Sequence, residues 1–141
     1  TSMSNETLAA LHTALLDAEA GYEKAIEKAE DPRFVTLFRE MHALHGAAHH
    51  DVHGVLTRRA ERTDESGSFM GSVNKAVVVV RAAITGLDEN ALSAFASGEA
   101  NTLERYDEAI SAETDRQVAA TLRQNRDKLA AKVAQMEAGS A

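Results

Sequence analysis

The sequence predicts an all-α protein, a bundle of four long amphipathic helices with one longer connection. Alanine is abundant, and β-branched residues gather mainly in one short segment, which favours helices over strands. Apolar residues recur at alternating spacings of three and four along four long stretches, as they do on one face of a helix. The chain of 141 residues has the size of one ordinary domain, so we expect residues 1–141 to form a single domain.

The first two long helices are predicted to form a hairpin. The first helix is expected over residues 5–30, and its apolar positions are Leu8, Leu11, Leu15, Ala18, Tyr22, Ala25 and Ala29. Asp31-Pro32 combines a capping acid with a proline at the first helical position, which predicts a second helix over 32–62. Its apolar positions are Phe34, Phe38, Met41, Ala48, Val52 and Leu56. A turn this short makes the two helices antiparallel neighbours.

A polar loop at 64–68 separates this hairpin from a short, very apolar helix expected over residues 72–85. Gly86 closes that short helix, and Asp88 is placed to cap the next long one.

The last two long helices are predicted over residues 88–111 and 114–138, the second opened by a capping box of Thr114 and Gln117. Their apolar positions are Leu92, Phe95, Leu103, Tyr106 and Ile110, followed by Val118, Leu122, Leu129, Val133 and Met136. Two hairpins joined by a long crossover that carries a short extra helix form the wiring of a ferritin-like four-helix bundle.

Composition excludes several classes of function. The formal net charge of −7 argues against nucleic-acid binding, which requires a basic surface. Membrane spanning is not expected, because no run approaches the roughly 18 apolar residues that a transmembrane helix needs. The absence of cysteine removes thiolate metal sites and disulfides. Without a signal-peptide pattern at the start of the sequence, a cytoplasmic protein is expected.

Histidines are concentrated in the second predicted helix. At about 100° per residue, an arc of roughly 80° contains four of them, which are His42, His45, His49 and His53. His45 falls inside the apolar arc of this helix, His49 at its edge, and the other two further out. A single histidine at such an edge is more often a hydrogen-bonded boundary residue than a ligand. Four on one stripe favour a metal site, because residues three and four apart can hold one ion.

Two glutamates on other helices strengthen the metal hypothesis. Glu99 lies near the centre of the apolar stripe of the third long helix, where an ionised carboxylate requires a partner or a metal. Glu19 lies at the edge of the first helix's apolar arc, with His12 two turns earlier on the same side. Glu19 could equally be an edge residue that reaches water.

The position of Glu99 within an apolar stripe can also be explained without a metal. Arg126 or Lys132 on the last helix could neutralise it in an ion pair, and a hydrogen bond from His45 would also be sufficient. The last helix itself offers Asn125 near the middle of its stripe, but no acid and no histidine there.

The sequence resembles the small bacterial ferritin-like four-helix-bundle proteins of unknown function, and more distantly the YciF/YciE-type stress-associated proteins. The stretches that carry the resemblance are Asp17–Tyr22, Asp31-Pro32, the crossover from Ser66 to Gly86, and Gly98-Glu99 through Tyr106–Ala109. The resemblance implies a ferritin-like bundle and places Glu19 and Glu99 where such proteins carry carboxylates on their first and third helices. Di-iron members also use Glu-x-x-His motifs. This chain has none, which argues against a full di-iron centre.

Two main functional hypotheses follow, beside a weaker third in which the histidine stripe is a pH-responsive surface that gains charge as pH falls. The first is a divalent transition metal, zinc, iron or manganese, bound between the first three long helices; its predicted ligands are Glu19, His45, His49, Glu99 and, as an extra ligand, His42. The second is a metal-free, self-associating structural protein, with a stress-related role under either hypothesis. A homodimer is expected in either case, because the segment Ala76–Val80 is apolar on every side. Whether the protein catalyses a reaction stays open at this level.

Overall fold

A computed structural model describes residues 3–59 and 89–139, and the described chain is helical apart from short connections. The helices are α1 (Met3–Lys28), α2 (Pro32–Arg58), α4 (Glu89–Ala112) and α5 (Arg116–Gly139). The predicted all-α four-helix bundle is confirmed; the second helix begins at residue 32 as in the prediction, and the other predicted boundaries differ from these by one to four residues. The short helix predicted over 72–85 lies outside the described residues.

Side-chain caps begin two of the helices. Asp31 accepts a hydrogen bond from the backbone N–H of Arg33 at 2.9 Å, and Pro32 occupies the first helical position as predicted. Asp115 caps α5 by accepting from the N–H groups of Gln117 at 2.9 Å and Val118 at 3.3 Å. The cap predicted at Thr114 is therefore wrong by one residue: the carboxylate of Asp115 supplies the acceptor as a single N-cap side chain.

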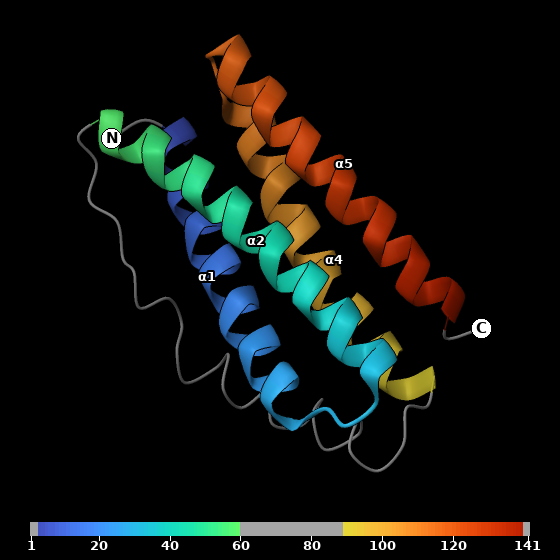
Figure 1. The fold of residues 1–141 in the computed structure, drawn as a ribbon. Coiled ribbons are helices and arrows are strands. Elements are labelled where there is room, and N and C mark those ends of the chain that lie inside the picture. Colours follow the sequence, from blue (N-terminus) through green and yellow to red (C-terminus); the bar gives the residue numbers. More distant parts are fainter. Residues whose placement is uncertain (1–2, 60–88, 140–141) are drawn as a thin grey trace.

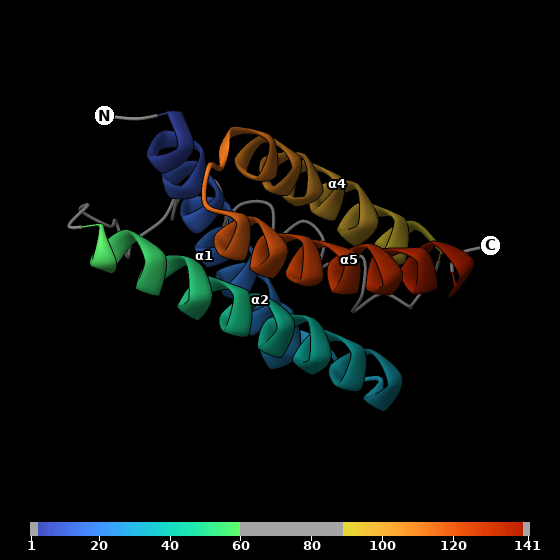
Figure 2. The same cartoon turned by 90° about the horizontal axis from the view of Figure 1, so that it is seen from above.

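The four helices form two antiparallel hairpins, α1 with α2 and α4 with α5 (Figure 1). The hairpins pack through α1 against α4 and through α2 against α5, as the view from above also shows (Figure 2). The α1–α5 and α2–α4 pairs are consequently diagonal to each other. α2 ends and α4 begins at opposite ends of the bundle, which is the predicted wiring with one crossover (Figure 1).

The core runs along the centre of the bundle and combines apolar side chains from all four helices. Tyr22 stacks on Phe95 with ring centroids 5.2 Å apart, and Phe38 lies 4.7 Å from Phe95. These contacts join α1, α2 and α4 through aromatic packing. Within the ranges described here, none of the helices is both long and apolar enough to cross a membrane.

Arg59, directly after α2, links α1 and the turn between α4 and α5 at one end of the bundle. Its guanidinium donates to both carboxylate oxygens of Glu113, at 3.1 and 2.9 Å, in the short turn between α4 and α5. It also donates to Asn5 Oδ1 at 3.0 Å. Burial acts to raise the pKa of Glu113, but hydrogen bonds from Arg59 and the backbone of Asp115 lower it, and the net pKa is below its ordinary value.

Candidate metal centre

Polar side chains line the interface between α1 and α2 from end to end. Because these helices are antiparallel, residues early in α1 meet residues late in α2. The pairs in contact, in order along α2, are His42 with Glu23, His45 with Tyr22, His49 with Glu19, His53 with His12, and Arg59 with Asn5. The histidine stripe of α2 therefore runs along α1, with His42 at its exposed end.

Three of these histidines form a compact cluster. His12 of α1 and His49 and His53 of α2 each bring one ring nitrogen within 4.8 Å of the other two. The ring centroids of His12 and His49 are 4.7 Å apart, and His53 lies 5.8 Å from His12. His12 is buried, and the two histidines of α2 are partly exposed. The cluster thus lies at the boundary between the core and the surface.

Glu19 contacts this cluster through one member. Its Oε1 lies 3.2 Å from Nδ1 of His49, and both side chains are about one-fifth exposed, at 19% and 20%. Glu19 follows His12 by seven residues, two helical turns, so the two project from the same face of α1. The structure therefore places a carboxylate beside the three imidazoles.

His45 and Glu99 form a separate pair in the core. Nε2 of His45 lies 2.6 Å from Oε2 of Glu99, and the side chains are 1% and 4% exposed. Nδ1 of His45 is buried and has no hydrogen-bond partner among the described residues. The pair connects α2 with α4, which are diagonal helices, so it crosses the centre of the bundle.

Tyr22 completes the surroundings of this pair. Its ring stacks on that of His45 at a centroid distance of 5.9 Å and an interplanar angle of 19°. Burial, followed by the negative charge of Glu99, raises the pKa of the Tyr22 hydroxyl well above its ordinary value. Burial and Glu99 also raise the pKa of Tyr106. Both hydroxyls are therefore held in the protonated form.

The five residues predicted as ligands are distributed over three contacts. His49 belongs to the histidine cluster, with Glu19 beside it, whereas His45 and Glu99 pair with each other deeper in the core. His42 lies at the surface, one-third exposed, with Nε2 3.2 Å from Glu23 Oε1.

The two cationic side chains considered as partners of Glu99 form ion pairs with other carboxylates. Arg126 donates to Asp107 at 2.9 Å, and Lys132 forms an ion pair with Glu40. The interpretation in which either side chain neutralises Glu99 is wrong. The alternative hydrogen bond between His45 and Glu99 is the one that the structure contains.

His12 and His53 were not among the predicted ligands. A helical wheel of α2 places His53 away from the apolar arc of that helix. The wheel alone does not show that α1 packs over His53. The available signal was the i, i+4 spacing of His49 and His53, combined with His12 on the same side of α1 as Glu19. Antiparallel pairing about the Asp31-Pro32 turn would have brought the early part of α1 opposite the late part of α2.

The cluster has the donors that a transition metal requires. Tetrahedral zinc with bonds of about 2.0–2.1 Å to nitrogen places its ligand nitrogens roughly 3.3 Å apart. Relative to the 4.8 Å limit seen here, the nitrogens need to approach by about 1.5 Å at most. Changes in side-chain torsion angles displace ring nitrogens over distances of this order.

A sequence model of the family Domain of unknown function (DUF2383) matches residues 3–112. The chain belongs to the DUF2383 family. The match includes α1, α2 and α4, and so contains every residue of the histidine cluster and of the His45–Glu99 pair, while α5 begins after it. Neither the curated proteins nor the solved structures that were compared with the chain gave a match.

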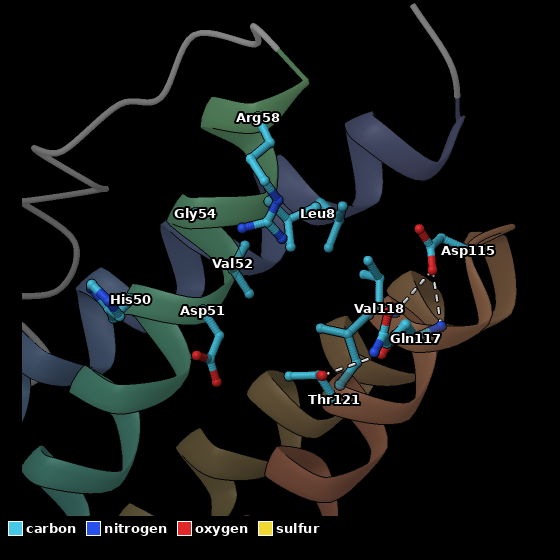
Figure 3. Close-up of a pocket in the computed structure, with 12 residues that line it drawn as sticks. Leu8, His50, Asp51, Val52, Gly54, Arg58, Asp115, Gln117, Val118 and Thr121 are labelled. Atoms are coloured by element: carbon cyan, nitrogen blue, oxygen red, sulfur yellow. Dashed lines mark hydrogen bonds between the residues drawn. The ribbon is translucent and has the colours of Figure 1, made fainter.

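This DUF2383 protein also has a pocket of about 480 Å³ away from the histidine cluster, between α2 and α5 (Figure 3). His50, Asp51 and Arg58 line it from α2, and Asp115 lies across it at the start of α5. On the α5 side, Asp115 caps the helix and the hydroxyl of Thr121 donates to the backbone carbonyl of Gln117 at 3.2 Å. We therefore place the candidate site of this DUF2383 protein at the α1–α2 interface.

Proposed function

We propose that this protein binds a divalent transition metal ion through His12, His49 and His53. The observation that supports the proposal is the convergence of three ring nitrogens, from two helices, within 4.8 Å of one another. Imidazole nitrogens are among the commonest ligands of divalent transition metals, and three of them gathered at one point can bind a single ion.

The donor set narrows the choice of metal. Imidazole nitrogen suits zinc, iron, copper and nickel, whereas manganese prefers carboxylate and water ligands. Of the metals predicted from the sequence, a site of three histidines favours zinc and iron over manganese. Zinc also accepts the tetrahedral geometry that three ligands from two adjacent helices can approach.

The wider ligand set predicted from the sequence remains a prediction. For His45 and Glu99 to act as ligands, their mutual hydrogen bond at 2.6 Å must open, which costs part of the binding free energy. For His42, the partner is the exposed Glu23, and the rearrangement is smaller. Variants at these positions therefore test the wider set separately from the cluster.

Metal content per chain tests the proposal. Untagged protein is incubated with zinc, iron(II) or manganese, desalted, and analysed by mass spectrometry. About one ion per chain is expected for the native protein, and a content near zero for His12→Ala, His49→Ala and His53→Ala. The matched control is His50→Ala, which removes an exposed histidine from the same helix outside the cluster.

Two further variants distinguish the ligand sets. His45→Ala and Glu99→Ala retain the metal if the three-histidine cluster is the site, and lose it if the wider predicted set is correct. Metal content near zero for the native protein with every ion contradicts the proposed function.

A second candidate function is a metal-free scaffold that self-associates, and the His45–Glu99 pair favours it, since that pair satisfies the buried carboxylate without an ion. Under this proposal residues 1–141 form one domain that assembles as a homodimer. Its apolar surface would come from Ala76–Val80, which lie outside the described residues. A stress-related role rests only on the resemblance to YciF/YciE-type proteins. Light scattering of the metal-free protein tests the dimer: a monomeric mass at high concentration contradicts it.

A further inference from the structure

We infer that the three-histidine site keeps an open fourth coordination position, which takes water or a small anion, and that Glu19 positions His49 and does not bind the metal. This inference rests on the proposed function, because it describes the coordination of that same ion. It assigns the site to the class that exchanges a small ligand, as opposed to a closed structural site.

The contact between Glu19 and His49 determines which nitrogen faces the ion. Nδ1 of His49 lies 3.2 Å from Oε1 of Glu19, so this edge of the ring is turned toward the carboxylate. Nε2, on the opposite edge of the ring, is then the nitrogen that faces the ion. A carboxylate that holds one nitrogen of a metal-binding histidine fixes the tautomer and orients the ring.

The number of protein ligands leaves one tetrahedral position unfilled. Among the described residues, the group of His, Asp or Glu side chains whose ligand atoms all lie within 4.8 Å of one another consists of His12, His49 and His53. Glu19 reaches His49 but does not belong to that group. Zinc and cobalt sites with three protein ligands hold water in the fourth position.

The two sides of the site differ in their exposure. His12 is 1% exposed and closes the site on the side of the core, whereas the His49 side chain is 20% exposed and His53 is also partly exposed. The partly exposed rings of His49 and His53 therefore mark the outer side of the α1–α2 interface as the side from which a small ligand would approach, while the ring nitrogens His12 Nε2, His49 Nε2 and His53 Nδ1 are themselves buried. The ligand class that fits is a small monoanion that competes with water, because three neutral imidazoles leave the charge of a divalent cation uncompensated.

Cobalt(II) substitution with azide as the probe tests the inference. Tetrahedral cobalt(II) absorbs strongly in the visible range, and its bands report exchange at the fourth position. The native protein is expected to bind about one cobalt and to show a saturable change of the visible spectrum on titration with azide. Glu19→Gln is expected to bind cobalt about 10–100-fold more weakly while keeping the band positions and the azide response. Glu23→Gln is the matched control, because Glu23 pairs with His42 outside the cluster; it should leave cobalt affinity unchanged.

The outcomes separate the two proposals. If cobalt binds but azide leaves the spectrum unchanged, or if Glu19→Gln shifts the bands as the loss of a ligand would, the open position is refuted and metal binding stands. If cobalt does not bind at all, the proposed function fails and the inference falls with it.

Discussion

His45 of α2 and Glu99 of α4 meet across the diagonal of the bundle, with 2.6 Å between Nε2 and Oε2. The two helices do not pack against each other, so this contact joins the two hairpins through the middle of the core. Both side chains are shielded from water, and each is the polar partner that makes burial of the other tolerable. Removing one partner of this pair should therefore destabilise the fold strongly, and more than replacing both partners with apolar residues.

Glu99→Ala is expected to lower the free energy of unfolding by about 3–5 kcal/mol, because it leaves His45 buried without its acceptor. Replacing both residues together, as His45→Phe with Glu99→Leu, should recover a large part of that loss, since apolar residues need no partner. Urea unfolding followed by circular dichroism measures both. Glu104→Ala, on the exposed side of α4, is the control, with an expected change within about 0.5 kcal/mol. A loss below 1 kcal/mol for Glu99→Ala would show that the pair does not support the core.

The two tyrosines should resist ionisation in the folded protein. Burial and the charge of Glu99 raise the pKa of both Tyr22 and Tyr106, and the chain contains no other tyrosine and no tryptophan. A spectrophotometric titration at 295 nm should show no tyrosinate near pH 10, where an exposed tyrosine ionises. Full ionisation at about pH 10 without unfolding would contradict the buried placement.

The same pKa shifts fix the direction of alkaline destabilisation. Above about pH 10 the unfolded chain releases the phenolic protons and the folded protein keeps them, so the unfolded state binds fewer protons and stability falls as pH rises. The expected slope is about 1.4 kcal/mol per pH unit for each tyrosine. Tyr22→Phe should reduce that slope by about half, which urea unfolding at several pH values measures.

The Arg59–Glu113 contact should give the protein an acid-sensitive component of stability. The pKa of Glu113 is lower in the folded protein than its value of about 4.5 in the unfolded chain. The stabilisation that the ionised carboxylate provides is therefore fully present above about pH 4.5, and it is lost as pH falls through the lower pKa of the folded state. Arg59→Ala is expected to cost about 2–3 kcal/mol at pH 7 and progressively less below pH 4. Arg123→Ala, an exposed arginine of α5, should leave the pH dependence unchanged. An Arg59→Ala cost that stays constant down to pH 3 would contradict this account.

Zinc should stabilise the native protein through the histidine cluster. A ligand that binds only the folded state raises the free energy of unfolding by about 2.7 kcal/mol at one hundred times its dissociation constant. Thermal unfolding with and without zinc should show an increase in Tm for the native protein and for His50→Ala. The same zinc concentration should leave the Tm of His12→Ala unchanged. An equal increase in Tm for that variant would show that zinc binds outside the histidine cluster.

The fold was accessible from the sequence because its signals are local. The spacing of apolar residues in α1 and α2 and the Asp31-Pro32 cap each depend on a few neighbouring residues. The burial of His45 and the exposure of His42 also followed from the wheel of α2 alone. The side-chain partners did not follow, because they depend on the rotation and register of one helix against another. Thus Glu99 was expected to need a partner, but that its partner is His45 on the diagonal helix, and not Arg126, required the structure.

His12, His49 and His53 all belong to the first hairpin, whose helices are joined by residues 29–31. Their convergence therefore needs contacts within one hairpin only, which carry a smaller loop-closure cost than contacts between the hairpins. The His45–Glu99 contact, by comparison, forms only when residues 54 positions apart meet across the crossover. Under the proposed function the two contacts would report different steps of assembly: metal binding would depend on the first hairpin alone, and the environment of the buried glutamate on the docking of the second hairpin.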